Sequence, residues 1–552
     1  MRADVLIVGG GLAGGAAAAT AAQLGLSVIL IEELEWLGGQ VTAQGVPFDE
    51  HPWNETVMWS RSYWGYRERI RDYYRQHMPL TAKARQAFPL NPGMGRVSSL
   101  CHEPRVSVRV IDDLLAPYTF GARLRVLKRH RLMQAHLQGD RIEGVTVRDL
   151  ERGRDIAIAA DIFIDASETG ILIDAAQVEH VVGAESRSET GELHALEQAN
   201  PRDQAGMTWC VALDYLPDED HTIERPATYD FWREYRPLSW PGPLLSFTSS
   251  DHFTHKTRHY PLFDGDSDRE RAPDLWHFRR IAYRRNFEPG TYASDVTIAC
   301  WGMNEYLLRP MIGIPPDEEA QGLAQARAQT LSMVYWLQTE APRHDGGAGY
   351  RGLRPRGDVL GTADGLAMQP YYREGRRIRA ELTVVEEDFG VEARPGRDRA
   401  KFFDDSIGLG AYRMNIHPTT GGANSFDIPT YPYQIPLGAM LPVRIDNMIA
   451  GGCKLVGSTR LTTSSYRHHP IDWTIGEAAG ALAAVALQRG LPPRAIRARH
   501  EELRAYQARL SDLGVMLRWP DPLSMIMTYA QGADFARLFH ETQGTGRFPD
   551  VG

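Results

Sequence analysis

Cysteine is scarce in this sequence, which has four among 552 residues. They stand at positions 101, 210, 300 and 453, so no two of them form a CxxC pair. This spacing indicates neither a zinc site nor a redox-active dithiol, and we expect no metal. So few cysteines also favour a reducing compartment over a secreted, disulfide-stabilised protein.

A long uninterrupted hydrophobic run is absent too. The longest apolar stretch, residues 5–31, is broken by glycines and predicts a strand, a turn, a helix and a second strand instead of a membrane span. The sequence starts in an apolar strand, with no cleavable leader or twin arginine before it. We therefore expect a cytoplasmic protein without a membrane partner.

Basic residues form no cluster or tail, and the formal net charge is −9. Nucleic acid is therefore a poor candidate for a partner. Hydrophobic residues make up 43% and charged residues 24% of the sequence, as in ordinary globular proteins. The length allows more than one hydrophobic core. We therefore expect a chain that folds on its own.

The clearest motif is the N-terminal stretch "DVLIVGGGLAGGAAAATAAQLGLSVILIEE". Gly9 permits a tight turn, Gly11 lets a pyrophosphate approach the backbone, and Gly14 lets helix pack on strand. The following helix start offers free N–H groups to phosphate. Glu32 ends the next strand, where a carboxylate accepts hydrogen bonds from a ribose and disfavours NADP. The neighbouring residues predicted to contact the cofactor are Leu12, Ala13 and Glu33.

A second glycine turn, "EWLGGQVTAQG", follows this acid and contains Gly38, Gly39, Gln40 and Thr42. It resembles the turn beside the pyrophosphate and flavin ring in the FAD oxidoreductase superfamily that includes succinate dehydrogenase and fumarate reductase flavoproteins. The resemblance implies FAD as the cofactor. Gly39 stands where a histidine carries the covalent flavin link in the succinate dehydrogenase pattern, so we expect noncovalent FAD.

Two later segments resemble the same superfamily and, more closely, a bacterial "FAD-dependent oxidoreductase" family. The first, "RDIAIAADIFIDASETGILIDAA", resembles the strand and turn under the FAD, although Glu168 departs from the usual small or polar residue. The second joins "DNMIAGGCKLVGSTRL" to "PIDWTIGEAAGALAAVALQRG". The cofactor contacts that this resemblance implies are Ala166, Ser167, Gly170, Gly451, Gly452, Gly476 and Ala478, with backbone contacts to adenine near Leu132.

The resemblance also implies a fold class. We expect an α/β protein with a Rossmann-like FAD-binding domain, in which helices cover both faces of a parallel sheet, and an inserted mixed α+β cap domain. The FAD-binding domain would comprise residues 1–50, 98–180 and 438–490. The cap or substrate domain would comprise residues 51–97 and 181–437, and residues 491–552 a helical segment. "SRSYWGYRERIRDYYRQHM" predicts an amphipathic helix of the cap.

Candidate catalytic residues come from segments that this topology brings to the flavin ring. His468 and His469 precede Pro470, which suits the first turn of a helix. The only further metal ligand nearby is Asp472, so a metal pair is disfavoured. We expect one histidine to face the flavin or substrate, as a general base or an orienting donor. The other is expected to hydrogen-bond within the loop.

Two further groups are candidates for the substrate pocket. His417 in "NIHPTTGGANS" resembles the histidine of fumarate reductase substrate loops, with a polar residue in a connection as the alternative. Three arginines, Arg373, Arg376 and Arg377, could bind a substrate carboxylate, and we take Arg377 as the catalytic candidate. Salt bridging to Glu374 and Glu381 on a helix surface explains them equally well.

Together these features predict an FAD-dependent oxidase or dehydrogenase. It would take a hydride from a small polar organic substrate and pass electrons to oxygen or another acceptor. A flavin monooxygenase or halogenase is the first alternative, although the sequence has no second nucleotide-binding motif, no GDAAH-like motif and no WxWxIP signature. An alkene reductase and a non-catalytic flavin sensor are the others. The oligomeric state stays open.

Overall fold

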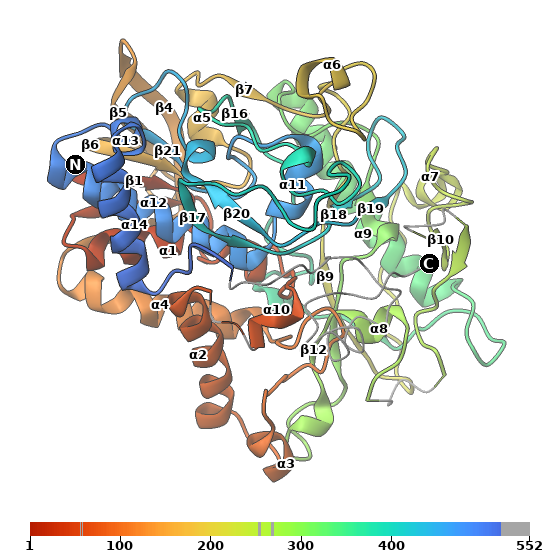
Figure 1. Ribbon diagram of the computed structural model, residues 1–552. Helices are drawn as coiled ribbons and strands as arrows, with labels where there is room; N and C mark the ends of the chain where they lie inside the picture. The colour runs from red at the N-terminus through yellow and green to blue at the C-terminus, as the bar shows by residue number, and fades with distance from the viewer. Residues whose placement is uncertain (56, 58, 252–255, 266–269, 520–552) are drawn as a thin grey trace.

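The computed structural model describes residues 1–552 except 56, 58, 252–255, 266–269 and 520–552. Its largest sheet has seven strands in the order β3-β2-β1-β6-β5-β4, with β21 also beside β6. These strands are β1 (Arg2–Val8), β2 (Val28–Glu32), β3 (Leu124–Lys128), β4 (His130–Gln138), β5 (Arg141–Asp149), β6 (Arg154–Asp165) and β21 (Met448–Ala450). Figure 1 labels β1, β4, β5, β6 and β21 of this sheet.

The parallel core of this sheet joins β3, β2, β1, β6 and β21. Strands β1 and β2 are almost continuous apolar runs because both faces of the sheet are covered. Val8 is in register with Ile31 and with Asp165, and Asp165 is in register with Ala450. Four strands therefore end at one edge, where ligands bind in such sheets. The expected Rossmann-like fold is confirmed.

Helices cover this sheet, and the two most closely packed are α1 and α12. A Cβ atom on Gly476 would lie 2.1 Å from the carbonyl oxygen of Ala13, and one on Gly480 would lie 2.5 Å from that of Ala17. The "GEAAG" segment is thus explained by contact between two helices.

The α-helices of the described chain have the following bounds: α1 (Leu12–Gln23), α2 (Arg61–His77), α3 (Ala82–Gln86), α4 (Pro104–Phe120), α5 (Ile171–Ala175), α6 (Arg187–Thr190), α7 (Tyr229–Glu234), α8 (Leu275–Phe278), α9 (Pro316–Thr339), α10 (Gly357–Leu360), α11 (Arg460–Tyr466), α12 (His469–Arg489), α13 (Pro493–Ala498) and α14 (His500–Leu513).

A second, antiparallel layer is built by the middle of the chain. Its sheet has the order β12 (Arg280–Ala282), β13 (Val296–Ala299), β9 (Val211–Tyr215) and β15 (Leu353–Pro355). Separate two-stranded pairs are also present: β7 (His180–Val181) with β16 (Arg377–Ile378), β8 (Met207–Thr208) with β14 (Glu305–Tyr306), β10 (Thr248–Ser250) with β11 (Thr257–His259), β17 (Ser406–Gly410) with β20 (Tyr433–Pro436), and β18 (Met414–Ile416) with β19 (Phe426–Ile428). The proposed domain boundaries stay a prediction.

Helix α2 forms where the pattern predicted a helix, but its polar residues are not all on a solvent face. Arg67 and Arg71 are fully buried. Both guanidinium groups pair with Glu55, and Arg67 also pairs with Glu50 at 3.0 Å. These ion pairs let the charged residues pack inside.

Residues 491–552 were predicted to form a helical segment. Up to residue 519 this segment contains the helices α13 and α14, and residues 520–552 lie outside the described residues. Among the described helices, none is long and apolar enough to cross a lipid bilayer.

Candidate cofactor and substrate site

The first glycine turn connects β1 to α1 at the ligand-binding edge of the sheet. Gly9 has a φ of +97°, which favours glycine. A Cβ atom on Gly14 would lie 1.9 Å from the carbonyl oxygen of Gly9, so helix and turn could not pack with a larger residue. On Gly11 the nearest atom would be 3.7 Å away, which leaves that face of the turn open. Leu12 and Ala13 are the first two residues of α1, and both are buried.

The second glycine turn lies against the first. The N–H of Gly38 donates to the carbonyl oxygen of Gly10 at 2.7 Å, and a Cβ atom on Gly39 would lie 3.0 Å from the Cα of Gly11. Thr42 fixes the turn, because its Oγ1 donates to the carbonyl oxygen of Leu37 at 2.7 Å. Two bare backbone surfaces therefore face each other beside the start of α1.

Glu32 occupies the strand end expected for a ribose-binding acid. Its carboxylate accepts hydrogen bonds from the backbone N–H groups of Gly10 at 2.7 Å and Leu34 at 2.8 Å. Burial raises the pKa of Glu32 to about 7, although these hydrogen bonds lower it. Glu33 instead points outward and pairs with Arg131 at 2.6 Å on the surface.

The turn after β6 is held by a buried carboxylate. Asp165 accepts hydrogen bonds from the N–H and Oγ of Ser167 and from the N–H groups at the start of α5. Gly170, with a φ of +80°, precedes α5, and its N–H donates to Ser167 Oγ at 3.1 Å. Ala166 donates its N–H to the carbonyl oxygen of Val8, which places this turn beside the first glycine turn.

Glu168, the departure noted in this turn, lies over the two glycine turns. Its Oε1 would be 3.0 Å from a Cβ on Gly39 and 3.7 Å from one on Gly11. It forms an ion pair with Lys454, whose side chain is 8% exposed. Sequence reasoning missed Lys454, although a basic residue directly after "AGGC" was a readable signal.

The C-terminal turn joins the same edge of the sheet. Gly451 packs against Ile164, and its N–H donates to the carbonyl oxygen of Asp165 at 2.7 Å; Gly452 follows it. Asp472 accepts from the N–H of Cys453 at 2.9 Å and from that of Ala13 at 3.2 Å, tying this turn to α1. Leu132 lies in β4, opposite Val147 of β5. Gly476 and Ala478 lie on α12.

These residues fit an FAD molecule. The two turns present backbone without side chains, as a pyrophosphate requires. Beside them, buried side-chain atoms lack hydrogen-bond partners within the described part of the chain: Nε2 of Gln40 and both amide atoms of Gln44. Unpartnered buried amides are costly and mark groups that await a polar ligand. Gln44 was not among the predicted contacts.

His468 and His469 have opposite tautomers. His468 Nδ1 donates to the carbonyl oxygen of Ser465 at 2.9 Å, which leaves a lone pair on Nε2. His469 Nδ1 accepts from the backbone N–H of Asp49 at 2.9 Å, closer than the carbonyl oxygen of that residue at 3.3 Å, so its proton is on Nε2. Both Nε2 atoms are buried and lack hydrogen-bond partners within the described ranges.

Both imidazoles are neutral at physiological pH. Burial lowers the pKa of His468 to about 3 and that of His469 to about 4, and nearby Asp49 opposes both shifts. A ring stack between His468 and Tyr412, with centroids 3.4 Å apart, fixes the first imidazole.

Asp49 is the carboxylate of this cluster. Burial raises its pKa, but positive charge at His468 when protonated and at three arginines outweighs this and holds the pKa below its usual range. Tyr412 donates its hydroxyl to Oδ1 of Asp49 at 3.0 Å. Oδ2 lies 4.0 Å from His468 Nε2. Sequence reasoning missed Asp49, whose position after the second glycine turn was the only signal.

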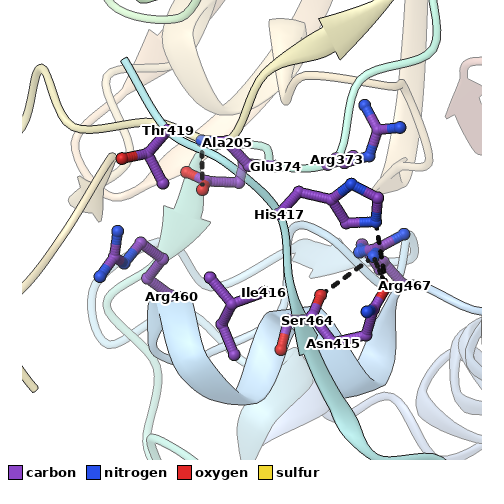
Figure 2. A pocket seen from close by; sticks show the side chains of 10 residues that line it. All are labelled: Ala205, Arg373, Glu374, Asn415, Ile416, His417, Thr419, Arg460, Ser464 and Arg467. Carbon is purple, nitrogen blue, oxygen red and sulfur yellow. Dashed lines mark hydrogen bonds between the residues drawn. The ribbon is translucent and has the colours of Figure 1, made fainter. Parts of the chain in front are cut away.

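A pocket opens next to this cluster, and its linings come from widely separated segments (Figure 2). His417 lies in it with both ring nitrogens engaged, Nδ1 with Glu305 at 2.7 Å and Nε2 with Asn415 at 3.0 Å. The full lining is Ala205, Arg373, Glu374, Asn415, Ile416, His417, Thr419, Arg460, Ser464 and Arg467. Arg467 directly precedes His468, but neither His468 nor His469 is among the lining residues.

The arginines predicted together are separated by the structure. Arg377 is fully buried and holds the carbonyl oxygens of Ser458 and Gly183 and the carboxylate of Glu185. Arg376 bonds the carbonyl oxygen of Thr169 at 3.1 Å. Neither lines the pocket, whereas Arg373 does. The catalytic role of Arg377 stays a prediction, and its contacts favour a structural one.

Two cysteines that are distant in sequence become neighbours. Val211 of β9 pairs with Ala299 of β13, so Cys210 and Cys300 follow as the next opposed residues. The pKa of Cys300 is lowered to about 6, because the hydrogen bond between the two thiols and the charges of Arg279 and Arg373 together outweigh the effect of burial. Sequence spacing could not reveal this contact.

Within the described ranges, no group of three or more histidine, cysteine or acidic residues could hold a metal ion.

Three solved structures show partial and distant similarity to this chain. The myxobacterial chondrochloren halogenase CndH, an FAD-dependent halogenase, is 17% identical over 41% of this chain and 46% of its own, with a TM-score of 0.23. The flavin-dependent monooxygenase PieE is 13% identical over 39% and 35%, with a TM-score of 0.24. Glycerol-3-phosphate dehydrogenase from Bacillus halodurans is 12% identical over 39% and 40%, with a TM-score of 0.23.

The chain thus spans less than half the length of these three structures, and such low scores carry no argument about the reaction. The chain matches no curated protein. The sequence profile described as "FAD dependent oxidoreductase", in contrast, matches residues 4–510, nearly the whole chain, and its cofactor is the one that the glycine turns fit. The chain belongs to the FAD dependent oxidoreductase family.

Proposed function

We propose that this protein oxidises a small polar organic substrate, which gives a hydride to noncovalent FAD, and that oxygen or another acceptor then takes the electrons. FAD, when bound, supplies the two-electron acceptor. The resemblance to the succinate dehydrogenase and fumarate reductase superfamily is part of this proposal. It stands on the second glycine turn around Gly38 and Gly39.

The observation that carries the proposal is the pair of opposite tautomers at His468 and His469. Oxidation at a carbon that bears O–H or N–H requires loss of the hydride and of that proton. The lone pair on His468 Nε2 can accept the proton as a general base. The N–H on His469 Nε2 is a donor that could orient a polar group of the substrate. Two adjacent residues thus provide one acceptor and one donor, both without another partner in the described structure.

Asp49 and Tyr412 suit this role for His468. A base whose pKa is about 3 is weak, so the imidazolium needs compensation once it forms. The Asp49 carboxylate lies 4.0 Å from His468 Nε2 and provides negative charge there. Tyr412 fixes both groups, stacking on the imidazole and donating to the carboxylate. Their burial removes water, which strengthens the electrostatic interaction.

Anaerobic mixing of the purified, yellow holoprotein with a panel of hydroxy acids, amino acids, amines and alcohols tests the proposal. We expect loss of the oxidised flavin absorbance with at least one class and its return on admitting oxygen or an artificial acceptor. A protein that releases no flavin on denaturation would overturn the cofactor assignment. Reduction by NADPH alone, followed by a peroxyflavin spectrum with oxygen, would favour the monooxygenase alternative instead.

A further inference from the structure

Cys210 and Cys300 stand opposite each other where β9 meets β13. The two strands are antiparallel, and Val211 is in register with Ala299. Continuing this register by one residue sets Cys210 against Cys300. Both side chains are buried, at 0% and 5% exposure, and both thiols are free. The fold thus brings together two thiols from distant segments of the sequence.

The backbone at this pair has the form that suits a disulfide. The N–H of Cys300 donates to the carbonyl oxygen of Ile298 at 3.1 Å, and the carbonyl oxygen of Cys210 accepts from the N–H of Ala367 at 2.8 Å. That N–H and that carbonyl oxygen are therefore not bonded to each other across the strands. In an antiparallel ladder, the Cα atoms of opposed residues without mutual hydrogen bonds lie about 4.5 Å apart, and a disulfide spans about 4.4–6.8 Å.

The two thiols differ in acidity. Their mutual hydrogen bond, with the charges of Arg279 and Arg373, holds the pKa of Cys300 at about 6 in spite of burial. Burial instead raises the pKa of Cys210 well above its usual range. At neutral pH the pair therefore holds one thiolate, on Cys300, beside one thiol, on Cys210. A thiolate is the nucleophile in cysteine oxidation, and a neighbouring thiol condenses with the sulfenic acid that forms.

Arg279 provides positive charge on the same face of the sheet. It directly precedes β12, where Arg280 is in register with Thr297 of β13. Its carbonyl oxygen accepts from the N–H of Ile298 at 3.1 Å, so Arg279 is opposite Ile298. Opposed residues share a face, as do residues two apart on one strand, which puts Arg279 on the face of Cys300. Its buried Nε and Nη1 lack hydrogen-bond partners within the described chain, and a thiolate offsets their charge.

We propose that Cys210 and Cys300 are a site of reversible oxidation, where hydrogen peroxide joins the two thiols into a disulfide between β9 and β13. The Cys300 thiolate attacks one peroxide oxygen, the O–O bond breaks, and the hydroxide that leaves takes a proton to become water. The Cys210 thiol then attacks the resulting sulfenic sulfur, so that the S–S bond forms, the S–O bond breaks and a second water leaves. Two electrons pass from the thiols to the peroxide. A small dithiol reverses the change by thiol–disulfide exchange.

The oxidation is expected to be selective for this pair. Cys300 keeps 5% of its surface exposed and Cys210 keeps none, so Cys300 is the thiol that peroxide meets first. Burial raises the pKa of the other two cysteines, that of Cys101 to about 12 and that of Cys453 well above its usual range. These two stay protonated at neutral pH, and a buried thiol without thiolate character is inert.

Peroxide treatment of the holoprotein tests the inference without turnover, so its outcome is independent of the proposed function. Remaining thiols are alkylated after denaturation and counted by intact mass. Untreated protein should carry an alkyl group on each of its four cysteines. Peroxide should remove the groups from Cys210 and Cys300, peptide mapping should find these two residues linked, and dithiothreitol should restore full alkylation. Full alkylation after peroxide, a link between any other pair, or sulfinic acid at Cys300 without a link would overturn the inference.

Cysteine variants assign the two roles. Cys210→Ala should form a sulfenic acid at Cys300, which dimedone traps, but no link. Cys300→Ala should keep its remaining thiols under the same treatment, because Cys210 has no thiolate character. Cys101→Ala is the matched control, since Cys101 is also buried, and it should form the same link as the parent. Dimedone on Cys210 instead of Cys300, or loss of the link in the control, would contradict the assignment. The mapped link in the parent protein decides the question if a variant does not fold.

Discussion

The ring nitrogen Nδ1 of His469 accepts a hydrogen bond from the backbone N–H of Asp49 at 2.9 Å, across 420 residues of sequence. This bond fixes the His469 tautomer and places the segment after the second glycine turn against the start of α12. Asp49, from the N-terminal part of the chain, thereby forms one buried cluster with His468 and His469 from the C-terminal part.

Lys454 should support FAD binding by neutralising Glu168. In Lys454→Met, an uncompensated carboxylate faces the bare backbone of Gly11 and Gly39, where the phosphates are expected, and we predict at least about tenfold weaker FAD binding. Glu168→Gln should retain FAD. The double variant should recover it, because both charges are gone. FAD titration of the apoprotein measures this, and a double variant as weak as Lys454→Met would refute the charge explanation.

Gly476→Ala should destabilise the fold. The added Cβ would lie 2.1 Å from the backbone of Ala13, so α1 and α12 must separate, at a cost of about 1–3 kcal/mol. Gly65→Ala is the control, since a Cβ there meets nothing within 4 Å and alanine favours the interior of α2. Chemical denaturation of both variants gives the comparison. Equal stability of Gly476→Ala and the parent protein would show that the helices do not touch there.

His468 should make the folded state less stable in acid. Burial lowers its pKa from 6.5 to about 3, so the unfolded chain takes up a proton that the folded chain refuses. Its stabilising contribution is complete above pH 6.5 and is lost as the pH falls towards 3; by pH 5 about 2 kcal/mol is lost. His468→Gln should therefore lose less stability between pH 7 and pH 5 than the parent. The same loss in both proteins would mean that His468 titrates normally.

Much of the cofactor surface could be predicted from sequence because its determinants are local. The glycine spacing and the apolar strands around Gly9 and Gly39 specify turns and buried strands within short windows. The Rossmann-like fold class followed from the resemblance, whereas the order of the strands was not predicted. Small residues around Gly476 were also noticed, but their role in packing on α1 needed the partner helix to be known.

The substrate side could not be predicted in the same way. Arg279 and Asp49 stand in segments without a motif, and only the folded chain shows that they share a buried region with His468. The run containing Arg373 and Arg377 shows the difficulty most clearly. Neighbours in sequence face different surroundings here, since Arg377 lies in the short strand β16 and Arg373 lies in the pocket.

The central claim is that the lone pair on His468 takes the substrate proton, and the rate of anaerobic flavin reduction in His468→Gln tests it most directly. With a substrate that reduces the parent holoprotein, stopped-flow measurements should show a rate lower by about 10²–10⁴-fold at unchanged FAD content. His136→Gln, at the exposed end of the sheet where His136 bonds Thr146, should reduce at the parent rate. A parent-like rate in His468→Gln with that substrate would contradict the account.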